Sequence, residues 1–296
     1  MTTFITGGAS QIGLGLARRL HQADRSILFG SRAGRGTDGF AWVPFDWDDA
    51  STFENAFKRQ DIKPVESVYI LPAVAIDPLP KVAPFIDLAI EKGVKRFVVI
   101  SAADCPKGGP EMGAVHGYLE KVVLKKRGLI DYVALRPTWF TDNLSREQYT
   151  HIKEHDEVVT PLHKARVPFI AVEDIAQAAF EAIVHEGVID PEDKANSEPI
   201  LIGPNLVSYD EVAQILSTVL GRPIKHRTIS RDEALAQYIS YGFPEASAKI
   251  VVEVELSLDK GSAERLMTDD EFAVVRKVGK VGVQEYVEKN KGIWLK

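Results

Sequence analysis

The chain has 296 residues, of which 45% are hydrophobic, and its formal charge at pH 7 is -6. This length and hydrophobic content are enough for a large α/β domain with an appended lobe. The mildly acidic balance gives no broad basic field to attract nucleic acid, and no apolar stretch approaches the roughly 20 residues that a transmembrane helix needs.

Cysteine usage indicates a reducing compartment. The chain has a single cysteine, Cys105, which leaves no partner for an intramolecular disulfide. The N-terminus itself reads as a core strand, so we expect no secretory signal and a cytoplasmic location. We expect small-molecule partners, with no nucleic acid and no membrane, and the composition leaves the oligomeric state open.

Residues 3–6 read as a strand that runs into a glycine-rich turn and then into an amphipathic helix. Glycine lets the backbone approach a phosphate closely, and a helix N-terminus offers unpaired N–H groups and a positive dipole end. We therefore expect a dinucleotide pyrophosphate to bind at Gly7, Gly8, Ser10, Gln11, Ile12 and Gly13. The alternative is an ordinary tight turn between a strand and a helix.

The second strand, residues 26–30, is followed by Ser31 and Arg32. In dinucleotide folds an acidic residue here binds the ribose 2′-hydroxyl of NAD, whereas an arginine accommodates the 2′-phosphate of NADP. This chain has no acidic residue at the strand end, so Ser31 and Arg32 predict NADP(H), with Arg35 as a second candidate. A solvated loop arginine is the alternative.

Strands and helices alternate through the rest of the first half. We expect strands at 42–46, 67–71, 96–101 and 132–136, and helices at 50–59, 81–91 and 114–126. Short, continuously apolar strands between helices indicate a parallel sheet that is buried on both faces. The predicted fold class is α/β, a Rossmann-like doubly wound parallel sheet.

The second half is less regular. We expect helices at 172–186 and 209–220, strands at 199–202 and 224–229, and further helices from residue 231 to the end. No Pro- or Ser-rich linker separates the halves. We predict an NADP(H)-binding core over residues 1–145 and a smaller, mostly helical substrate lobe over 146–296 that packs on it, with elements that can return to the core sheet.

Ligands of open α/β sheets bind beyond the carboxyl ends of the strands. The residues at these ends are further candidates for cofactor binding: Asp46, Trp47, Leu71, Pro72, Ala73, Ser101, Pro137 and Thr138. Asp46 can accept a hydrogen bond from the adenine amine, or it can serve only as a turn-forming residue before a helix.

Several stretches resemble the NmrA-like atypical short-chain dehydrogenases, and in particular the fungal festuclavine and agroclavine dehydrogenases of ergot-alkaloid formation. They are Phe45-Asp46-Trp47, residues 107–113 followed by 116–119, Leu135 to Phe140 followed by Asn143-Leu144, and residues 202–204 followed by 209–222. In that family NADPH reduces a cyclic iminium that forms when an aldehyde condenses with an internal secondary amine. Gln11-Ile12-Gly13 departs from the Gly-Lys-Thr of many members and is closer to ordinary short-chain dehydrogenases.

The acid/base residues also depart from ordinary short-chain dehydrogenases, which place a Tyr and a Lys four residues apart on one helix. Tyr118 has Val122 at that spacing and Lys121 at three, while Ser101 lies where the usual catalytic serine would. An iminium is already a cation and takes hydride directly, so no proton has to reach an oxygen. Tyr118, His116 and Ser101 are the candidate catalytic residues, with ordinary packing as the alternative for His116 and Tyr118.

Trp139 and Phe140 follow the last strand of the first half, where nicotinamide and substrate should meet. Aromatic faces suit an indole or a cation, and a nearby carboxylate such as Asp104 favours a cationic substrate. The predicted substrate contacts are Trp139, Phe140, Asn143 and Asp104. The predicted substrate is cationic and either aromatic or heterocyclic. Packing in the core is the alternative for the two aromatics.

A zinc-protease pattern, H-x-x-E-H, occurs at residues 151–155, but no context for a third ligand accompanies it, so we expect no metal.

Together with the family resemblance, the sequence predicts an NADPH-dependent iminium reductase. Two alternatives stay open, namely a non-catalytic NADP-sensing regulator of the NmrA type and a quinone or enone reductase.

Overall fold

The structure is a computed structural model that describes residues 1–296 except 33–35, 37, 73 and 74. Within the described residues the chain forms two compact units. The first comprises Met1–Pro137 and Ile175–Ile200, and the second Thr138–Asp174 and Leu201–Lys296. The boundary between cofactor core and substrate lobe that we expect after residue 145 stays a prediction.

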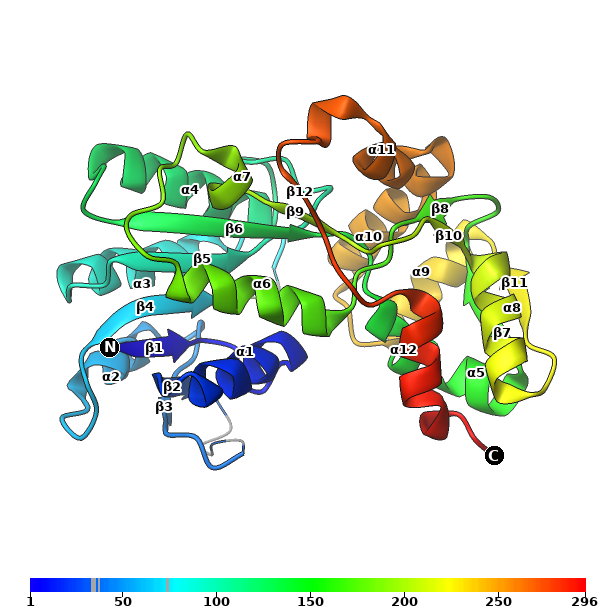
Figure 1. The fold of residues 1–296 in the computed structure, drawn as a ribbon, viewed down its shortest axis with the longest axis horizontal. Helices are drawn as coiled ribbons and strands as arrows, with labels where there is room; N and C mark the ends of the chain where they lie inside the picture. Colours follow the sequence, from blue (N-terminus) through cyan, green and yellow to red (C-terminus); the bar gives the residue numbers. More distant parts are fainter. Residues whose placement is uncertain (33–35, 37, 73–74) are drawn as a thin grey trace. The chain divides into compact units, whose positions relative to one another are not determined.

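The first unit is built on a parallel sheet (Figure 1) with the strand order β6-β5-β4-β1-β2-β3. Its strands are β1 (Thr2–Ile5), β2 (Ser26–Ser31), β3 (Trp42–Pro44), β4 (Val65–Ile70), β5 (Arg96–Ile100) and β6 (Asp131–Pro137). All four residues of β1 are buried, and so are all five of β5. The apolar runs in the sequence form strands because both faces of the sheet are covered. The predicted Rossmann-like class is confirmed.

Helices connect these strands. The unit contains α1 (Gln11–Gln22), η1 (Ala50–Thr52), α2 (Asn55–Lys58), α3 (Leu79–Glu91), α4 (Met112–Lys125), α7 (Lys194–Ser197) and, from Ile175 onward, α6 (Val172–Val184). Phe85 of α3 and Leu119 of α4 pack in one core with Phe4 of β1. Elsewhere Arg19 of α1 donates to Gln177 of α6 at 3.0 Å. The helix expected over 50–59 is instead split into η1 and α2.

The second unit is mostly helical. Its helices are η2 (Thr141–Ser145), α5 (Tyr149–His155), α8 (Tyr209–Leu220), α9 (Arg231–Ser240), α10 (Glu245–Ser257), η3 (Leu258–Lys260), α11 (Ser262–Thr268), η4 (Asp270–Phe272), α12 (Val283–Asn290) and η5 (Lys291–Ile293). Its short strands are β7 (Glu157–Thr160), β8 (Arg166–Val167), β10 (Val207–Ser208), β11 (Lys225–Thr228) and β12 (Arg276–Val278), and β9 (Ile200–Ile202) begins in the first unit and ends in this one. Strand β11 pairs in parallel with β7, and β10 pairs antiparallel with β8.

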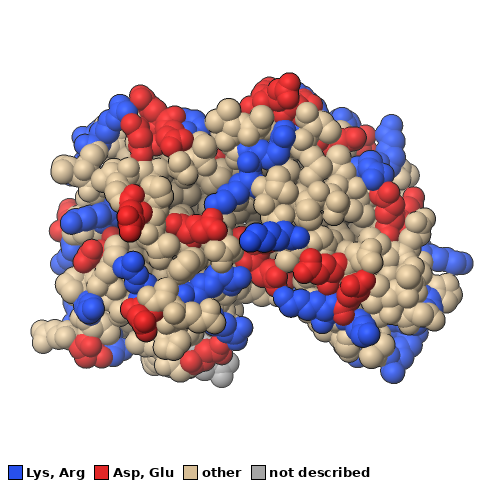
Figure 2. All heavy atoms as spheres, viewed as in Figure 1, with Lys and Arg blue, Asp and Glu red and all other residues tan. Residues whose placement is uncertain are grey.

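Surface charge is mixed. On the face drawn in Figure 2, lysine and arginine side chains alternate with aspartate and glutamate. Of the helices in the described residues, none has the length and the apolar content to cross a lipid bilayer.

Candidate active site

The turn between β1 and α1 is shaped so that side chains cannot fit at its glycines. A Cβ atom at Gly13 would lie 2.2 Å from the carbonyl oxygen of Gly7, and one at Gly8 would lie 2.4 Å from the ring of Phe29. Ser10 caps α1: its hydroxyl accepts from the N–H of Gly13 at 3.0 Å and donates to the carbonyl of Gly7 at 2.6 Å. Because the glycines carry no side chains, the backbone at the helix N-terminus is open to an anion.

A cavity of about 770 Å³ lies over this turn, entirely within the first unit. Its lining includes nine of the predicted cofactor residues, namely Gly7, Gly8, Ser10, Ser31, Arg32, Asp46, Trp47, Leu71 and Pro72. It also includes Thr6, Ala9, Phe29, Gly30, Phe45, Asp48 and Lys81. The cavity thus runs along the carboxyl ends of β4, β1, β2 and β3, where a doubly wound sheet binds its ligand.

The other predicted cofactor residues that the structure describes are absent from this lining. Ile12 and Gly13 are buried in the first turn of α1, and Gln11 is exposed at its start. Ser101 follows β5 and its hydroxyl is buried without a hydrogen-bond partner among the described residues. Ala73, like the second arginine candidate Arg35, lies outside the described residues.

Arg32 is exposed at the edge of the cavity and, within the described part of the chain, forms no ion pair. Its planar guanidinium is therefore available to a phosphate, in the bidentate geometry that arginine favours. Together with the glycine turn, this arrangement fits a dinucleotide with a 2′-phosphate.

The residues after β3 also line the cavity. Trp47 Nε1 donates to the carbonyl of Leu71 at 3.1 Å, and Asp46 Oδ1 accepts from the backbone N–H of Asp48 at 3.1 Å. The Asp46 side chain thus has the turn-forming role that sequence analysis left as one of two possibilities. Contact with adenine stays a prediction.

Sequence analysis missed Lys81 and Asp48. Lys81 lies in the first turn of α3, and its ammonium forms an ion pair with the Asp48 carboxylate. A helix that follows a strand of a parallel sheet begins near the carboxyl end of that strand. That rule could have identified Lys81, because it is the first charged residue of the predicted helix after β4.

The predicted acid/base residues do not line this cavity. The Tyr118 hydroxyl donates to Asp87 Oδ1 at 2.6 Å, and burial together with this carboxylate raises the pKa of Tyr118 to about 12. His116 has no exposed surface. A phenol with so high a pKa is a weak proton donor at neutral pH.

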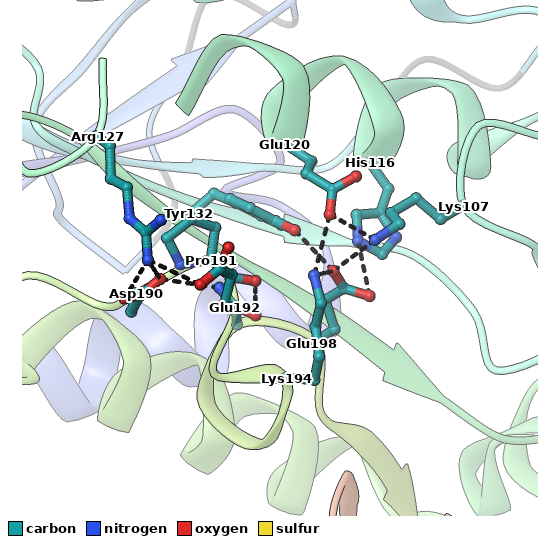
Figure 3. Close-up of polar contacts among 11 residues, drawn as sticks. Lys107, His116, Glu120, Arg127, Tyr132, Asp190, Pro191, Glu192, Lys194 and Glu198 are labelled. Carbon is teal, nitrogen blue, oxygen red and sulfur yellow. Dashed lines mark hydrogen bonds and ion pairs between the residues drawn. The ribbon is translucent and has the colours of Figure 1, made fainter. Parts of the chain in front are cut away.

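His116 instead adjoins a buried polar cluster centred on Glu198 (Figure 3). Glu198 Oε1 accepts from Lys194 at 2.6 Å, from Tyr132 at 2.8 Å and from Lys107 at 2.9 Å. His116 Nε2 lies 3.6 Å from Glu198 Oε2, and both lysines also contact Glu120. Burial alone would raise the pKa of Glu198, but these polar neighbours outweigh it and hold the pKa well below its usual value.

The cluster brings together residues that are distant in sequence. Glu198 has no local pattern that marks it, since it lies in an irregular segment before β9 and acquires its partners only through the tertiary fold. The cluster joins α4, β6 and the segment around α7. His116 therefore packs beside buried charged groups, and a catalytic role for it stays a prediction.

The remaining predicted residues span the end of β6 and the second unit. Pro137 is the last residue of β6, and Thr138 Oγ1 donates to the carbonyl of Pro168 at 2.6 Å. Trp139 is partly buried and packs against the core of the second unit. Phe140 and Asn143 are half-buried, with the Asn143 N–H donating to the carbonyl of Phe140.

Asp104 is exposed in the loop after β5. The histidines of the H-x-x-E-H pattern are in α5, where His151 contacts Glu157 at 3.3 Å and Gln237 at 3.1 Å. In the part of the chain that the structure describes, no group of three or more His, Cys, Asp or Glu side chains is placed to hold a metal ion.

Comparison with known proteins identifies the family. Residues 7–186 match the family model described as NAD(P)H-binding. The chain is 32% identical to agroclavine dehydrogenase of Claviceps fusiformis, over 100% of this chain and 99% of that one. It is 33% identical to festuclavine synthase II of Penicillium roqueforti, over 90% and 91% of the two chains.

Among solved structures, the triphenylmethane reductase of Citrobacter sp. complexed with NADP(H) has the same fold, with a TM-score of 0.73, 22% identity, and coverage of 98% of this chain and 99% of that chain. These findings confirm the resemblance drawn from the sequence motifs. The chain therefore belongs to the NAD(P)H-binding family of the agroclavine and festuclavine dehydrogenases, and it is an NAD(P)H-dependent oxidoreductase.

Proposed function

We propose that this protein uses NADPH to reduce the iminium carbon of a cyclic, alkaloid-like substrate. The names of the relatives support an alkaloid substrate, because agroclavine and festuclavine enzymes share about a third of its residues over most of their length. The preference for NADPH is supported by Arg32 and by the lack of an acidic side chain directly after β2.

The residues of the cavity fit the cofactor. Gly7, Gly8 and Ser10 would hold the pyrophosphate, Arg32 would pair with the 2′-phosphate, and Asp46 would accept a hydrogen bond from the adenine amine. When bound, the reduced nicotinamide supplies a hydride. The chain's own contribution is to bind and orient the two reactants and to exclude water from them.

One observation carries the choice of an iminium, namely the engagement of the Tyr118 hydroxyl by Asp87 together with its pKa of about 12. Addition of a hydride to an iminium carbon gives a neutral tertiary amine, and no proton is transferred. Reduction of a ketone or a quinone needs a proton on each oxygen. A chain whose candidate proton donor is bonded to a carboxylate and is a weak acid suits the first reaction better.

Substrate contacts are proposed at Trp139, Phe140, Asn143 and Asp104. The aromatic faces of Trp139 and Phe140 would stack on a heterocycle or a cation, and the Asp104 carboxylate would attract a positive charge. Ser101 and His116 would act by shaping the protein around the site.

The test is NADPH oxidation by the purified protein in the presence of a preformed cyclic iminium, with the product identified by mass as the amine that has gained one hydride. A quinone and an enone are offered in parallel at the same concentration. Turnover of the iminium with little turnover of the others supports the proposal. Rapid quinone reduction without iminium reduction would replace it with the quinone reductase function.

A further inference from the structure

The cavity over the glycine turn has a second cation besides Arg32. Lys81 reaches its wall from the first turn of α3, and its ammonium pairs with Asp48, which follows β3. The Lys81 side chain is 41% exposed and that of Asp48 is 63% exposed, so the pair lies at the mouth of the cavity. An exposed pair of this kind contributes little to stability, and its place in the cavity lining puts both charges within reach of a bound ligand.

Formal charges of the lining suggest that role. Among the described lining residues the acids are Asp46 and Asp48, and the cations are Arg32 and Lys81. With both cations present the lining is formally neutral. Without Lys81 the charge of Asp48 is uncompensated, and the lining becomes formally negative.

Binding of a 2′-phosphate should be sensitive to this difference in the charge of the lining. The 2′-phosphate of NADPH adds about 1.5 to 2 negative charges at pH 7, by analogy with other phosphate monoesters. If the cavity were a sphere of its volume it would be about 11 Å across, close to the Debye length of roughly 8–10 Å at ordinary salt. Charges on the wall therefore act on a bound phosphate with limited screening.

We propose that Lys81 is a second determinant of coenzyme preference, because its ammonium cancels the charge that Asp48 would otherwise present to the 2′-phosphate. This inference rests on the proposed use of NADPH. Arg32 attracts the phosphate, whereas Lys81 removes a repulsion. An arginine after β2 is then insufficient by itself for the preference, and Asp48 and Lys81 act as a unit.

The experiment measures binding by calorimetry, with 2′,5′-ADP and 5′-AMP as probes. These fragments differ only in the 2′-phosphate and need no turnover, so the readout is the ratio of their dissociation constants. We compare the wild-type protein with Lys81→Met, Asp48→Asn and the double variant. Lys58→Met is the matched control, because Lys58, the last residue of α2, pairs with Glu54 and does not line the cavity.

In Lys81→Met the preference for 2′,5′-ADP over 5′-AMP should fall by about threefold to tenfold. Coulomb's law gives this range for a unit charge about 10 Å from a phosphate, at an effective dielectric constant between that of water and that of a protein surface. The double variant should return to within about twofold of wild type, because both charges are gone. Lys58→Met should leave the ratio unchanged, and 1 M salt should reduce the effect.

Two results would overturn the inference. One is an unchanged ratio in Lys81→Met. The other is an equal loss in Lys81→Met and in the double variant, which would mean that Lys81 touches the ligand rather than cancelling Asp48. If wild-type protein binds 5′-AMP as tightly as 2′,5′-ADP, the proposed preference for NADPH itself fails, and that result is separate from any effect of Lys81.

Discussion

Replacing Glu198 with glutamine removes the charge at the centre of the cluster in Figure 3 and keeps the size of the side chain. The Glu198 side chain is only 8% exposed, and its Oε1 accepts from Lys107, Lys194 and Tyr132. In the variant Glu120 is the one carboxylate, among the described residues, that the two ammonium groups still share, and the buried Tyr132 hydroxyl faces a weaker acceptor. The variant should unfold more easily.

The magnitude follows from burial. Removal of one partner of a fully buried ion pair costs about 3–5 kcal/mol. The lysine side chains are 31% and 37% exposed, so water and Glu120 compensate in part, and we expect about 2–3 kcal/mol. At roughly 2–4 °C per kcal/mol for a chain of this size, the melting temperature should fall by about 4–12 °C.

The assay is thermal unfolding followed by circular dichroism, with Glu192→Gln as the control. Glu192 is in the same segment and pairs with Arg127, but its side chain is 70% exposed, so its loss should cost less than about 1 kcal/mol. If Glu198→Gln is no more damaging than Glu192→Gln, the cluster contributes no net stability and the reasoning fails.

The difference between wild type and Glu198→Gln should also depend on pH. The pKa of Glu198 is lowered in the folded protein, so its contribution is fully present above the usual pKa of a glutamate, near 4.5. That contribution should be lost as the pH falls below this value toward the folded pKa. Plotted against pH, the melting temperatures of the two proteins should therefore converge in acid and differ by a constant amount from about pH 6 upward. A difference that grows in acid would contradict the assignment.

Three predictions concern the proposed function. Arg32→Ala should weaken NADPH binding by roughly 1.5–3 kcal/mol and NADH binding much less, measured by titration of each coenzyme; equal losses would refute the role of Arg32. Tyr118→Phe should retain most turnover of a preformed iminium, since its phenol is bonded to Asp87 and has a pKa of about 12; a fall in kcat of about 10³-fold with the fold intact would instead indicate general acid catalysis. Trp139→Ala should lower kcat/KM by an amount equivalent to about 1–3 kcal/mol and leave NADPH affinity nearly unchanged, whereas unfolding or loss of NADPH binding would identify Trp139 as a core residue.

Local sequence was enough to predict the part of the site that depends on chain order. A strand, a glycine turn and a helix cap are contiguous, so Gly7, Gly13 and Ser10 could be recognised without knowledge of the rest of the fold. The same holds for Arg32, because the residue after the second strand of such a sheet has a fixed neighbourhood. Most of the strand ends collected from the sequence line one cavity for this reason.

Side-chain partners across the fold could not be predicted in this way. Tyr118 was a candidate acid because of its helix, but its partner Asp87 lies 31 residues away on α3. Glu198 lies 82 residues from His116 along the chain, and no periodicity marks it. Short strands such as β7 and β8 were missed because their pairing is set by packing in the second unit rather than by their few residues.

The sequence by itself therefore determined the fold class and the family and predicted a place for the cofactor, since apolar periodicity, glycine turns and motif order are properties of contiguous residues. Only the tertiary structure decided which charged groups meet. It paired Lys81 with Asp48 at the cavity and gathered Lys107, Lys194 and Glu198 within the first unit. The physical reason is that the charge and the proton affinity of a side chain depend on neighbours brought together from distant parts of the chain, and those neighbours are known only once the chain has packed.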